Sequence, residues 1–357
     1  MARILVTGAA GFIGFHLARR LLARGDQVTG LDNLCDYYDV ALKQARLAEL
    51  LPHGGFRFVR ADLADRAALE GVFAGDRFDA VVNLAAQVGV RHSVNHPRDF
   101  IDSNVVGFLN VLEGCRAGGA GHLVYASSSS VYGATTALPF SVEGGGTDHP
   151  LNLYAASKKA NELMAHAYSS LHALPTTGLR FFSVYGPWGR PDMAPFLFVR
   201  AVLEGKPILV FNHGQMERDF TYVDDIVEGI VRVLDRPPAP DASWSGDQPV
   251  PGASAAPYRV YNLGSHRPVP VLHLVRVIES CLGRRADVRM LPRQPGEALA
   301  TFADVEGLAR DFDFSPSTPV EVGMRRFVEW YLRFHGATAT ASPVDTDAAP
   351  QVTADAA

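Results

Sequence analysis

Tyr154 and Lys158 stand four positions apart in the stretch YAASK, a spacing that puts two side chains on one face of a helix. A neighbouring ammonium group lowers the pKa of a phenol, and a positively charged ligand lowers it further. The pair therefore predicts a tyrosine that removes a proton near neutral pH. The alternative is a packed tyrosine beside a solvated lysine, which the same spacing allows.

A row of hydroxyl groups follows the hydrophobic stretch HLVYA. Ser127, Ser128, Ser129 and Ser130 come directly after it, and VYG comes next. A flexible serine-rich linker is disfavoured because a buried-strand pattern precedes the row. We expect these serines at the carboxyl end of a strand, where parallel sheets bind ligands.

A glycine loop in the stretch TGAAGFIG lies between the first strand pattern and the first helix pattern. Gly8 permits a tight turn, Gly11 lets the backbone approach a pyrophosphate, and Gly14 allows the helix to pack closely. Asp32 ends the next strand pattern, where an acid meets ribose hydroxyls and repels a ribose phosphate. The combination predicts NAD rather than NADP, although a plain strand-turn-helix with Asp32 as a turn acid and Asp62 as a helix N-cap is the alternative.

The elements that must position these groups alternate between strand and helix patterns. The stretches RILVTG, QVTGLD, FRFVRADL, FDAVVNLAA and HLVYASS are strand patterns, with helical patterns between them. This alternation predicts an α/β fold in which helices cover both faces of a parallel sheet. Residues 237–257 are rich in proline, glycine and serine, and the segment after Gly336 has no periodicity, so we expect both to be mobile.

Composition excludes several classes of protein. The chain has 357 residues and is 47% hydrophobic, enough for a sizeable core. A formal net charge of −5 without a long basic run argues against nucleic-acid binding. The N-terminus lacks a signal-peptide pattern, and no stretch is apolar for long enough to predict a membrane span. Cys35, Cys115 and Cys281 are widely spaced, which indicates neither a disulfide framework nor a zinc site and fits the cytoplasm; we expect no metal.

The motifs TGAAGFIG, SSSSVYG and YAASK together resemble the extended short-chain dehydrogenase/reductase family of nucleotide-sugar epimerases and dehydratases, from the N-terminus to about residue 335. The resemblance implies a Rossmann-type doubly wound parallel sheet with a smaller C-terminal substrate-binding lobe, bound NAD and a homodimer. The expected division is a cofactor domain over residues 1–180, to which residues 222–263 return, a lobe over 181–335 and a flexible tail over 336–357.

The resemblance also assigns roles to individual positions. It implies that Ser128, Tyr154 and Lys158 are catalytic. The cofactor-binding residues that it implies, beyond Tyr154 and Lys158, are Gly8, Gly11, Phe12, Ile13, Asp32, Asn33, Asp62, Leu63, Leu84, Ala85, Ala86 and Asn104.

The residues after Ser128 separate branches of this family. Dehydratases resemble TDEVYG at this point and UDP-glucuronate decarboxylases resemble TSEVYG, whereas this chain has Ser129 and Ser130. Neutral hydroxyls bind a sugar or its carboxylate but are poor acids and bases for an elimination. The serines therefore favour redox chemistry without elimination.

Longer stretches, including RFFSVYGPWGRPDMAPFLF and VFNHGQMERDFTYVDDI, resemble the UDP-glucuronate 4-epimerase branch. The resemblance implies that a UDP-sugar is the partner and that Arg190 holds its carboxylate, since a guanidinium matches a carboxylate fork. A solvent-facing loop arginine is the alternative for Arg190. The substrate-binding residues that the resemblance implies are Ser128, Ser129, Ser130, Ser183, Arg190, Phe211, Asn212, Arg218 and Glu297.

Three other functions stay open from the sequence. The substrate could be UDP-glucose or UDP-galactose, or the reaction could be decarboxylation of UDP-glucuronate. A regulatory module that senses NAD without catalysis is the third, but it would be expected to lack Tyr154 or Lys158.

Overall fold

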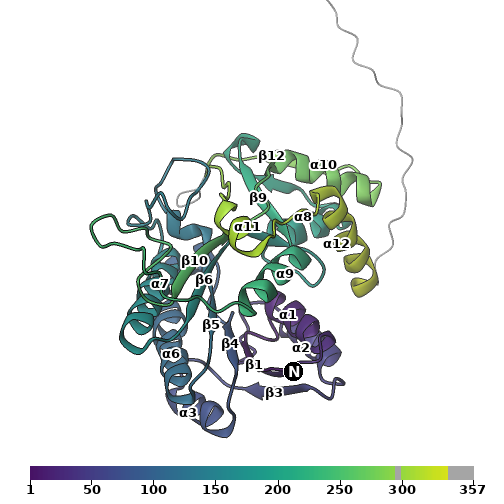
Figure 1. The fold of residues 1–357 in the computed structure, drawn as a ribbon. Coiled ribbons are helices and arrows are strands. Elements are labelled where there is room, and N and C mark those ends of the chain that lie inside the picture. Colours follow the sequence, from purple (N-terminus) through teal and green to yellow (C-terminus); the bar gives the residue numbers. More distant parts are fainter. Residues whose placement is uncertain (294–298, 337–357) are drawn as a thin grey trace, which may run out of the picture.

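A seven-stranded parallel sheet forms the centre of the computed structural model, which describes residues 1–293 and 299–336 (Figure 1). The chain starts in the middle of the sheet and winds outward in both directions, so the predicted doubly wound α/β fold is confirmed. In order across the sheet, the strands are β3 (Phe56–Arg60), β2 (Gln27–Asp32), β1 (Arg3–Thr7), β4 (Ala80–Asn83), β5 (Leu123–Ser128), β6 (Thr176–Phe181) and β10 (Tyr258–Leu263).

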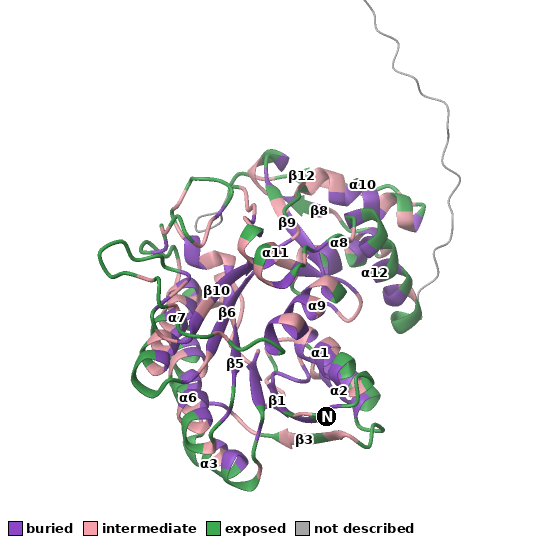
Figure 2. Cartoon of the chain, viewed as in Figure 1, coloured by how far each residue is buried: buried purple, intermediate pink, exposed green. Residues whose placement is uncertain are grey.

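Helices cover both faces of this sheet (Figure 2). Successive side chains of a strand enter opposite cores: Ile4 and Val6 of β1 face one, and Leu5 faces the other. Both faces are therefore apolar, as a buried parallel sheet requires. The first core packs under α1 (Phe12–Ala23), α2 (Val40–Leu50) and α9 (Val223–Leu234), and the second packs under α3 (Arg66–Gly75), α6 (Gly107–Gly118) and α7 (Leu153–His172).

Short helices join β4 to α6 at the carboxyl edge of the sheet. These are α4 (Val90–Asn95), α5 (Pro97–Ile101) and the π-helical turn η1 (Asp102–Val106). A 3-10 turn, η2 (Ser129–Tyr132), follows β5 in the same region. The connections at the carboxyl edge of the sheet after β4 and β5 therefore consist largely of short helical segments.

The later part of the chain builds a lobe beside that edge (Figure 1). The lobe has a three-stranded sheet and a two-stranded sheet with helices packed on them. Its elements are β7 (Ser183–Tyr185), α8 (Ala194–Leu203), β8 (Ile208–Val210), η3 (Asn212–Gly214), β9 (Glu217–Tyr222), β11 (Pro268–Pro270), α10 (Val271–Leu282), β12 (Val288–Met290), α11 (Glu306–Phe312) and α12 (Val320–His335).

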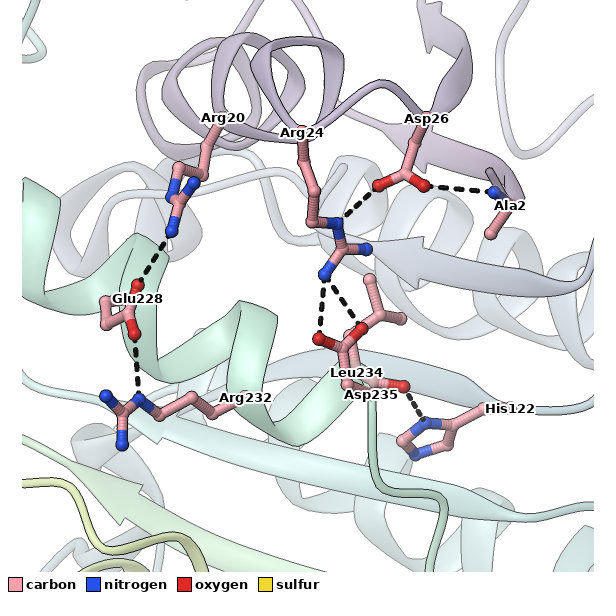
Figure 3. A network of polar contacts seen from close by, with 9 residues as sticks. All are labelled: Ala2, Arg20, Arg24, Asp26, His122, Glu228, Arg232, Leu234 and Asp235. Carbon is pink, nitrogen blue, oxygen red and sulfur yellow. Dashed lines mark hydrogen bonds and ion pairs between the residues drawn. The ribbon is translucent and has the colours of Figure 1, made fainter.

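Two segments of the later chain pack with the first part. Strand β10 pairs with β6, and helix α9 lies on α1. Figure 3 shows the polar seam around α9: Arg24 pairs with Asp235 at 2.7 Å, and Glu228 bridges Arg20 and Arg232. Exposed pairs of this kind contribute at most about 1 kcal/mol each, so the buried apolar face of α9 carries most of the packing energy. The division at residue 180 stays a prediction.

A buried ion pair joins α7 to β6. Glu162 accepts hydrogen bonds from Arg180 Nε at 2.8 Å and from Arg180 Nη2 at 2.9 Å, and both side chains are 1% exposed. Burial disfavours the charge of Glu162, but Arg180 outweighs it and lowers the pKa of the carboxyl group. Glu162 lies four residues after Lys158, which lies four residues after Tyr154, so the three side chains are on one face of α7. The ion pair between Glu162 and Arg180 therefore fixes the orientation of the helix face that carries Tyr154 and Lys158.

Replacing Glu162 with Gln leaves Arg180 as an uncompensated buried charge, and we expect a loss of about 3–5 kcal/mol in the free energy of unfolding. Urea denaturation measures this loss. The matched control is Glu70→Gln, which breaks the exposed pair between Arg66 and Glu70 and should cost less than about 1 kcal/mol. Equal losses in the two variants would contradict the structural role of the buried pair.

Candidate active site

A cavity of about 760 Å³ lies where the carboxyl ends of the parallel strands meet the lobe. It gathers nearly all of the side chains that the sequence singled out. Those that line it are Gly8, Gly11, Phe12, Ile13, Asp32, Asn33, Asp62, Leu63, Leu84, Ala85, Ala86, Ser128, Ser129, Ser130, Tyr154, Lys158, Ser183, Arg190, Phe211 and Arg218.

Two predicted residues do not line the cavity. Asn104 lies behind its wall, where it accepts from the Gln87 backbone N–H at 2.7 Å and donates to the Gln87 carbonyl at 3.0 Å, so it supports the loop after β4. Asn212 is in η3 with φ at +50° and donates to the Gln215 carbonyl. The predicted Glu297 lies outside the described residues.

The glycine loop has the shape of a phosphate cradle. Gly8 has φ at +70°, and a Cβ atom there would lie 2.8 Å from the backbone nitrogen of Ala85. A Cβ on Gly14 would lie 2.1 Å from the Gly8 carbonyl oxygen, so only glycine lets α1 pack this closely. The positive end of α1 then faces the cavity through bare backbone, which fits the pyrophosphate of a dinucleotide.

Asp32 braces this loop from the end of β2. One carboxylate oxygen accepts from the Ala10 backbone N–H at 3.1 Å, and the other accepts from the Leu34 N–H at 2.8 Å. Lys43 Nζ lies 4.0 Å from the carboxylate, and Lys43 also lines the cavity. This end of the cavity therefore contains a paired rather than an isolated acid. Lys43 was missed because it lies inside an ordinary amphipathic helix pattern.

Asp62 does not have the helix-capping role that was its alternative reading. Its carboxylate accepts from Ala64 N–H in a turn and from the Asn33 amide at 2.8 Å, whereas Asp65 caps α3 by accepting from Ala68 N–H. The N-cap reading of Asp62 is therefore wrong, because the strand-to-helix turn is three residues longer than that reading assumes. Asp62 and Asn33 form one polar corner of the cavity.

Tyr154 lies in the first turn of α7, which begins after Asn152. The Asn152 side chain caps the helix by accepting from Ala155 N–H at 2.9 Å. Lys158, one turn later, donates to the Ala126 carbonyl at 2.9 Å, and so joins α7 to β5 just before the serines. The Ser128 side chain is close enough to the phenol of Tyr154 to lower its pKa, and the Ser128 hydroxyl lies 3.2 Å from that of Ser130.

Within the trio of Tyr154, Lys158 and Ser128, burial has the largest effect on the pKa values of the tyrosine and the lysine. Burial raises the pKa of Tyr154, against the lowering effects of the Ser128 hydrogen bond and the Arg190 charge. Burial also lowers the pKa of Lys158 to about 8. The prediction of a tyrosine that is active near neutral pH included the charge of a bound ligand, and the raised pKa of Tyr154 in the protein alone gives that part of the prediction its importance.

Arg190 faces this trio from the lobe, near enough for its charge to act on Tyr154. Its Nε and Nη2 atoms donate to the two oxygens of Asp192 at 3.0 and 2.6 Å, and Asp192 also accepts from the Tyr37 hydroxyl at 3.1 Å. One edge of the guanidinium is thus held by the protein, which leaves Nη1 to bind a ligand carboxylate. Asp192 and Tyr37 were not singled out from the sequence because their contact joins residues that are 155 positions apart.

Arg46 is a further residue that the sequence did not reveal. It is fully buried, and its guanidinium donates to the Ala10 carbonyl at 2.8 Å and to the Trp188 carbonyl at 2.6 Å. It therefore links the glycine loop to the segment that carries Arg190. An arginine inside an amphipathic helix pattern is expected to face solvent, so only the tertiary structure exposes this role.

The arrangement defines a class of protein: a dinucleotide cradle opens onto a buried tyrosine and lysine, the equipment of an enzyme that oxidises and reduces an alcohol. Residues 4–250 match the model of the NAD dependent epimerase/dehydratase family, and the chain belongs to that family. The predicted family, extended short-chain dehydrogenase/reductase, and its cofactor, NAD, are confirmed. Among the described residues, no helix combines the length and the apolar character needed to cross a bilayer.

Three similar proteins are informative. The chain is 47% identical to a probable UDP-glucuronate 4-epimerase of Rhizobium meliloti, over 92% of this chain and 96% of the relative. It resembles the structure of a UDP-glucuronic acid 4-epimerase from Bacillus cereus in complex with UDP-glucuronic acid and NAD, with a TM-score of 0.81, 30% identity and 93% and 99% of the two chains covered. A Thermus thermophilus UDP-glucose 4-epimerase in complex with NAD is nearly as similar in fold, with a TM-score of 0.79, 29% identity and coverage of 94% and 100%.

The lowered pKa of Lys158 makes a prediction about stability. Since the unfolded pKa is near 10.5 and the folded pKa is about 8, the folded chain binds fewer protons between these values. Stability should therefore rise with pH across this window, and the penalty for the buried charge should be constant below it. We expect the free energy of unfolding of the wild type, relative to Lys158→Met, to be flat below pH 8 and to increase from there to pH 10.5.

Urea denaturation of both proteins from pH 6 to 11 measures this difference, with a size on the order of 3 kcal/mol. Lys206→Met is the matched control, because the Lys206 side chain is 71% exposed and its ammonium pairs with Glu204 at the surface. The rise in stability with pH should be specific to the comparison with Lys158→Met. A flat difference for Lys158→Met would show that Lys158 is not buried as a charge.

Proposed function

We propose that this chain is an NAD-dependent isomerase that interconverts UDP-glucuronate and UDP-galacturonate by inverting carbon 4 of the sugar. The observation that carries the proposal is Arg190, which is held by Asp192 beside Tyr154 and Ser128. A fixed guanidinium next to the site of alcohol oxidation suits a sugar that carries a carboxylate. The high identity to the Rhizobium relative supports the same substrate, whereas the fold alone does not distinguish uronate from neutral sugars.

In the proposed reaction, Tyr154 takes the proton of the 4-hydroxyl group while Ser128 hydrogen-bonds the same oxygen. Bound NAD would supply the redox chemistry, a reversible hydride transfer at carbon 4. Lys158 would hold the nicotinamide ribose and add positive charge near the phenolate. Tyr154 gives its proton back after the keto sugar has turned its other face.

The carboxylate must be restrained during this cycle. Oxidation at carbon 4 produces a β-keto acid, which loses carbon dioxide when its carboxylate stands perpendicular to the ketone. Arg190, with the hydroxyls of Ser129, Ser130 and Ser183, lines the cavity and would hold the carboxylate away from that orientation. The serine hydroxyls are poor acids and bases for an elimination, which favours epimerisation over loss of water.

The remaining substrate contacts belong to the lobe. Phe211 and Arg218 line the cavity and are proposed to contact the uridine and the diphosphate, respectively. Asn212 and Glu297 are part of the same proposal, Asn212 beside the uridine and Glu297 at its ribose. The proposed cofactor-binding residues are likewise those predicted from the sequence: the glycine loop, Asp32, the other cavity residues given above, and Asn104 behind the cavity wall.

The proposal includes a homodimer in the cytoplasm. Helices α6 and α7 leave large apolar side chains exposed, among them Leu109, Leu163 and Leu171, the last of which is 75% exposed. A pairing of these helices with those of a second chain would bury them. All three cysteines are free, which suits a reducing compartment.

The test is to incubate the purified protein with UDP-glucuronate, resolve the nucleotides by anion-exchange chromatography and monitor carbon dioxide. We expect UDP-galacturonate without gas. A pentose nucleotide with gas would instead establish the decarboxylase, and turnover of UDP-glucose alone would establish the neutral epimerase. A protein that binds NAD but converts none of these sugars would support the regulatory alternative.

Variants of the carboxylate clamp sharpen this test. Arg190→Lys keeps the charge but loses the planar fork, so we expect kcat/KM for UDP-glucuronate to fall about 10- to 100-fold and some carbon dioxide to appear. Asp192→Asn weakens the hold on the guanidinium and should act in the same direction. The control is Arg77→Lys, at an exposed arginine outside the cavity. Unchanged kinetics in both clamp variants would remove Arg190 from the proposed site.

A further inference from the structure

Two histidines and an aspartate lie together at the outer rim of the cavity. His92 belongs to α4 and His96 follows it one helical turn later, since the His96 backbone N–H donates to the His92 carbonyl at 2.9 Å. Asp99 lies in the first turn of α5. One ligand atom from each of the three side chains can be chosen so that all lie within 4.8 Å of one another. Neither His96 nor Asp99 lines the main cavity, so the proposed reaction does not use them.

The surroundings of this cluster are polar and negatively charged. The three side chains line a separate hollow of about 640 Å³, which adjoins the main cavity through shared wall residues. Asp36 and Asp102 face the same hollow, and neither lysine nor arginine is found among the described residues that line it. Such a hollow concentrates cations.

We propose that His92, His96 and Asp99 bind a divalent transition-metal ion of the Zn²⁺, Ni²⁺ or Co²⁺ type. Two imidazoles and one carboxylate suit these ions, whereas Mg²⁺ and Ca²⁺ prefer oxygen ligands alone. Histidines one helical turn apart are able to chelate one ion, and Asp99 adds a third ligand from the next helix. Solvent completes the coordination.

Only side-chain rotation is needed to form the site. A tetrahedral zinc ion with bonds of about 2.0–2.1 Å requires ligand atoms roughly 3.3 Å apart, so the separations must close by at most about 1.5 Å. The two imidazoles stack with centroids 4.2 Å apart, His92 Nε2 lies 3.8 Å from an Asp99 carboxylate oxygen, and His96 and Asp99 are exposed. Binding exchanges this stacking contact for coordination and leaves the helices in place.

The site connects to the carboxylate clamp through direct contacts. The His92 ring packs against the Tyr37 ring with centroids 4.9 Å apart, and the Tyr37 hydroxyl donates to Asp192. Asp192 in turn orients Arg190. An ion that turns the His92 ring therefore disturbs the support of Arg190 and lowers turnover of the uronate. The expected loss of turnover rests on the proposed function, but the binding of the ion does not.

The binding test uses the full chain without a histidine tag and without any sugar. Titration with Co²⁺, followed by its visible absorption, should saturate at one ion per chain, and Zn²⁺ should displace the Co²⁺. His96→Asn and Asp99→Asn should each weaken binding at least about tenfold, since each removes a ligand. His53→Asn, at an exposed histidine outside both cavities, should bind as the wild type does.

The absence of saturable Co²⁺ absorption, or equal binding by His96→Asn and the wild type, would overturn the metal site. The activity test then adds Zn²⁺ to wild type and His96→Asn during turnover of UDP-glucuronate. Inhibition of the wild type alone supports the connection to the clamp, and equal responses overturn that connection. A protein that binds Co²⁺ as expected but never converts UDP-glucuronate would overturn the proposed function and leave the metal site supported.

Discussion

The buried ion pair between Glu162 and Arg180 is the constraint on which the rest of the site depends. Burying two charges is costly, and the cost is offset here by two direct hydrogen bonds, by the Ser127 hydroxyl at 2.6 Å from Glu162 and by the Tyr132 hydroxyl at 3.0 Å from Arg180. Ser127 and Tyr132 flank Ser128, Ser129 and Ser130 in the chain, and all four serines line the cavity. The pair therefore ties the serine-bearing end of β5 to the face of α7 that carries Tyr154 and Lys158.

Burial also sets the chemistry of the site. It raises the pKa of Tyr154 and lowers that of Lys158, so the protein alone disfavours the charged forms of both groups. The ionised tyrosine becomes accessible only when positive charge is nearby, which Arg190 supplies in part and a bound nicotinamide would supply further. Such a site couples proton removal to occupancy of the cofactor cradle, and this coupling suits a reaction with no net change in oxidation state.

The sequence predicted the parts of this molecule whose physical signals are local. The glycine loop, Asp32 and the Tyr154–Lys158 spacing each depend on short stretches of backbone, and all line the cavity. Residues whose roles arise only from tertiary contact were missed. Arg46 and Lys43 lie within amphipathic helix patterns that predict exposed cations, and Asp192 lies 155 residues from its partner Tyr37.

Other differences have equally specific causes. Asn104 supports the Gln87 loop from a π-helical turn behind the cavity wall, a contact that the sequence did not reveal, and its expected role at the cofactor stays a prediction. The proximity of His92, His96 and Asp99 likewise arises only from tertiary structure, because His92 and Asp99 lie on two different short helices. The pattern of strands and helices thus predicts the cavity and its central chemistry, whereas the contacts that orient Arg190 require the folded lobe.

The central claim is that hydrogen leaves and returns to the same carbon within one closed site. UDP-glucuronate carrying deuterium at carbon 4 tests it most directly, in ordinary water and with unlabelled NADH in solution. The account predicts that UDP-galacturonate retains the deuterium at carbon 4, as measured by nuclear magnetic resonance and mass spectrometry. Loss of the label to water, or its exchange with the added NADH, would contradict a hydride that is returned by a cofactor held in place.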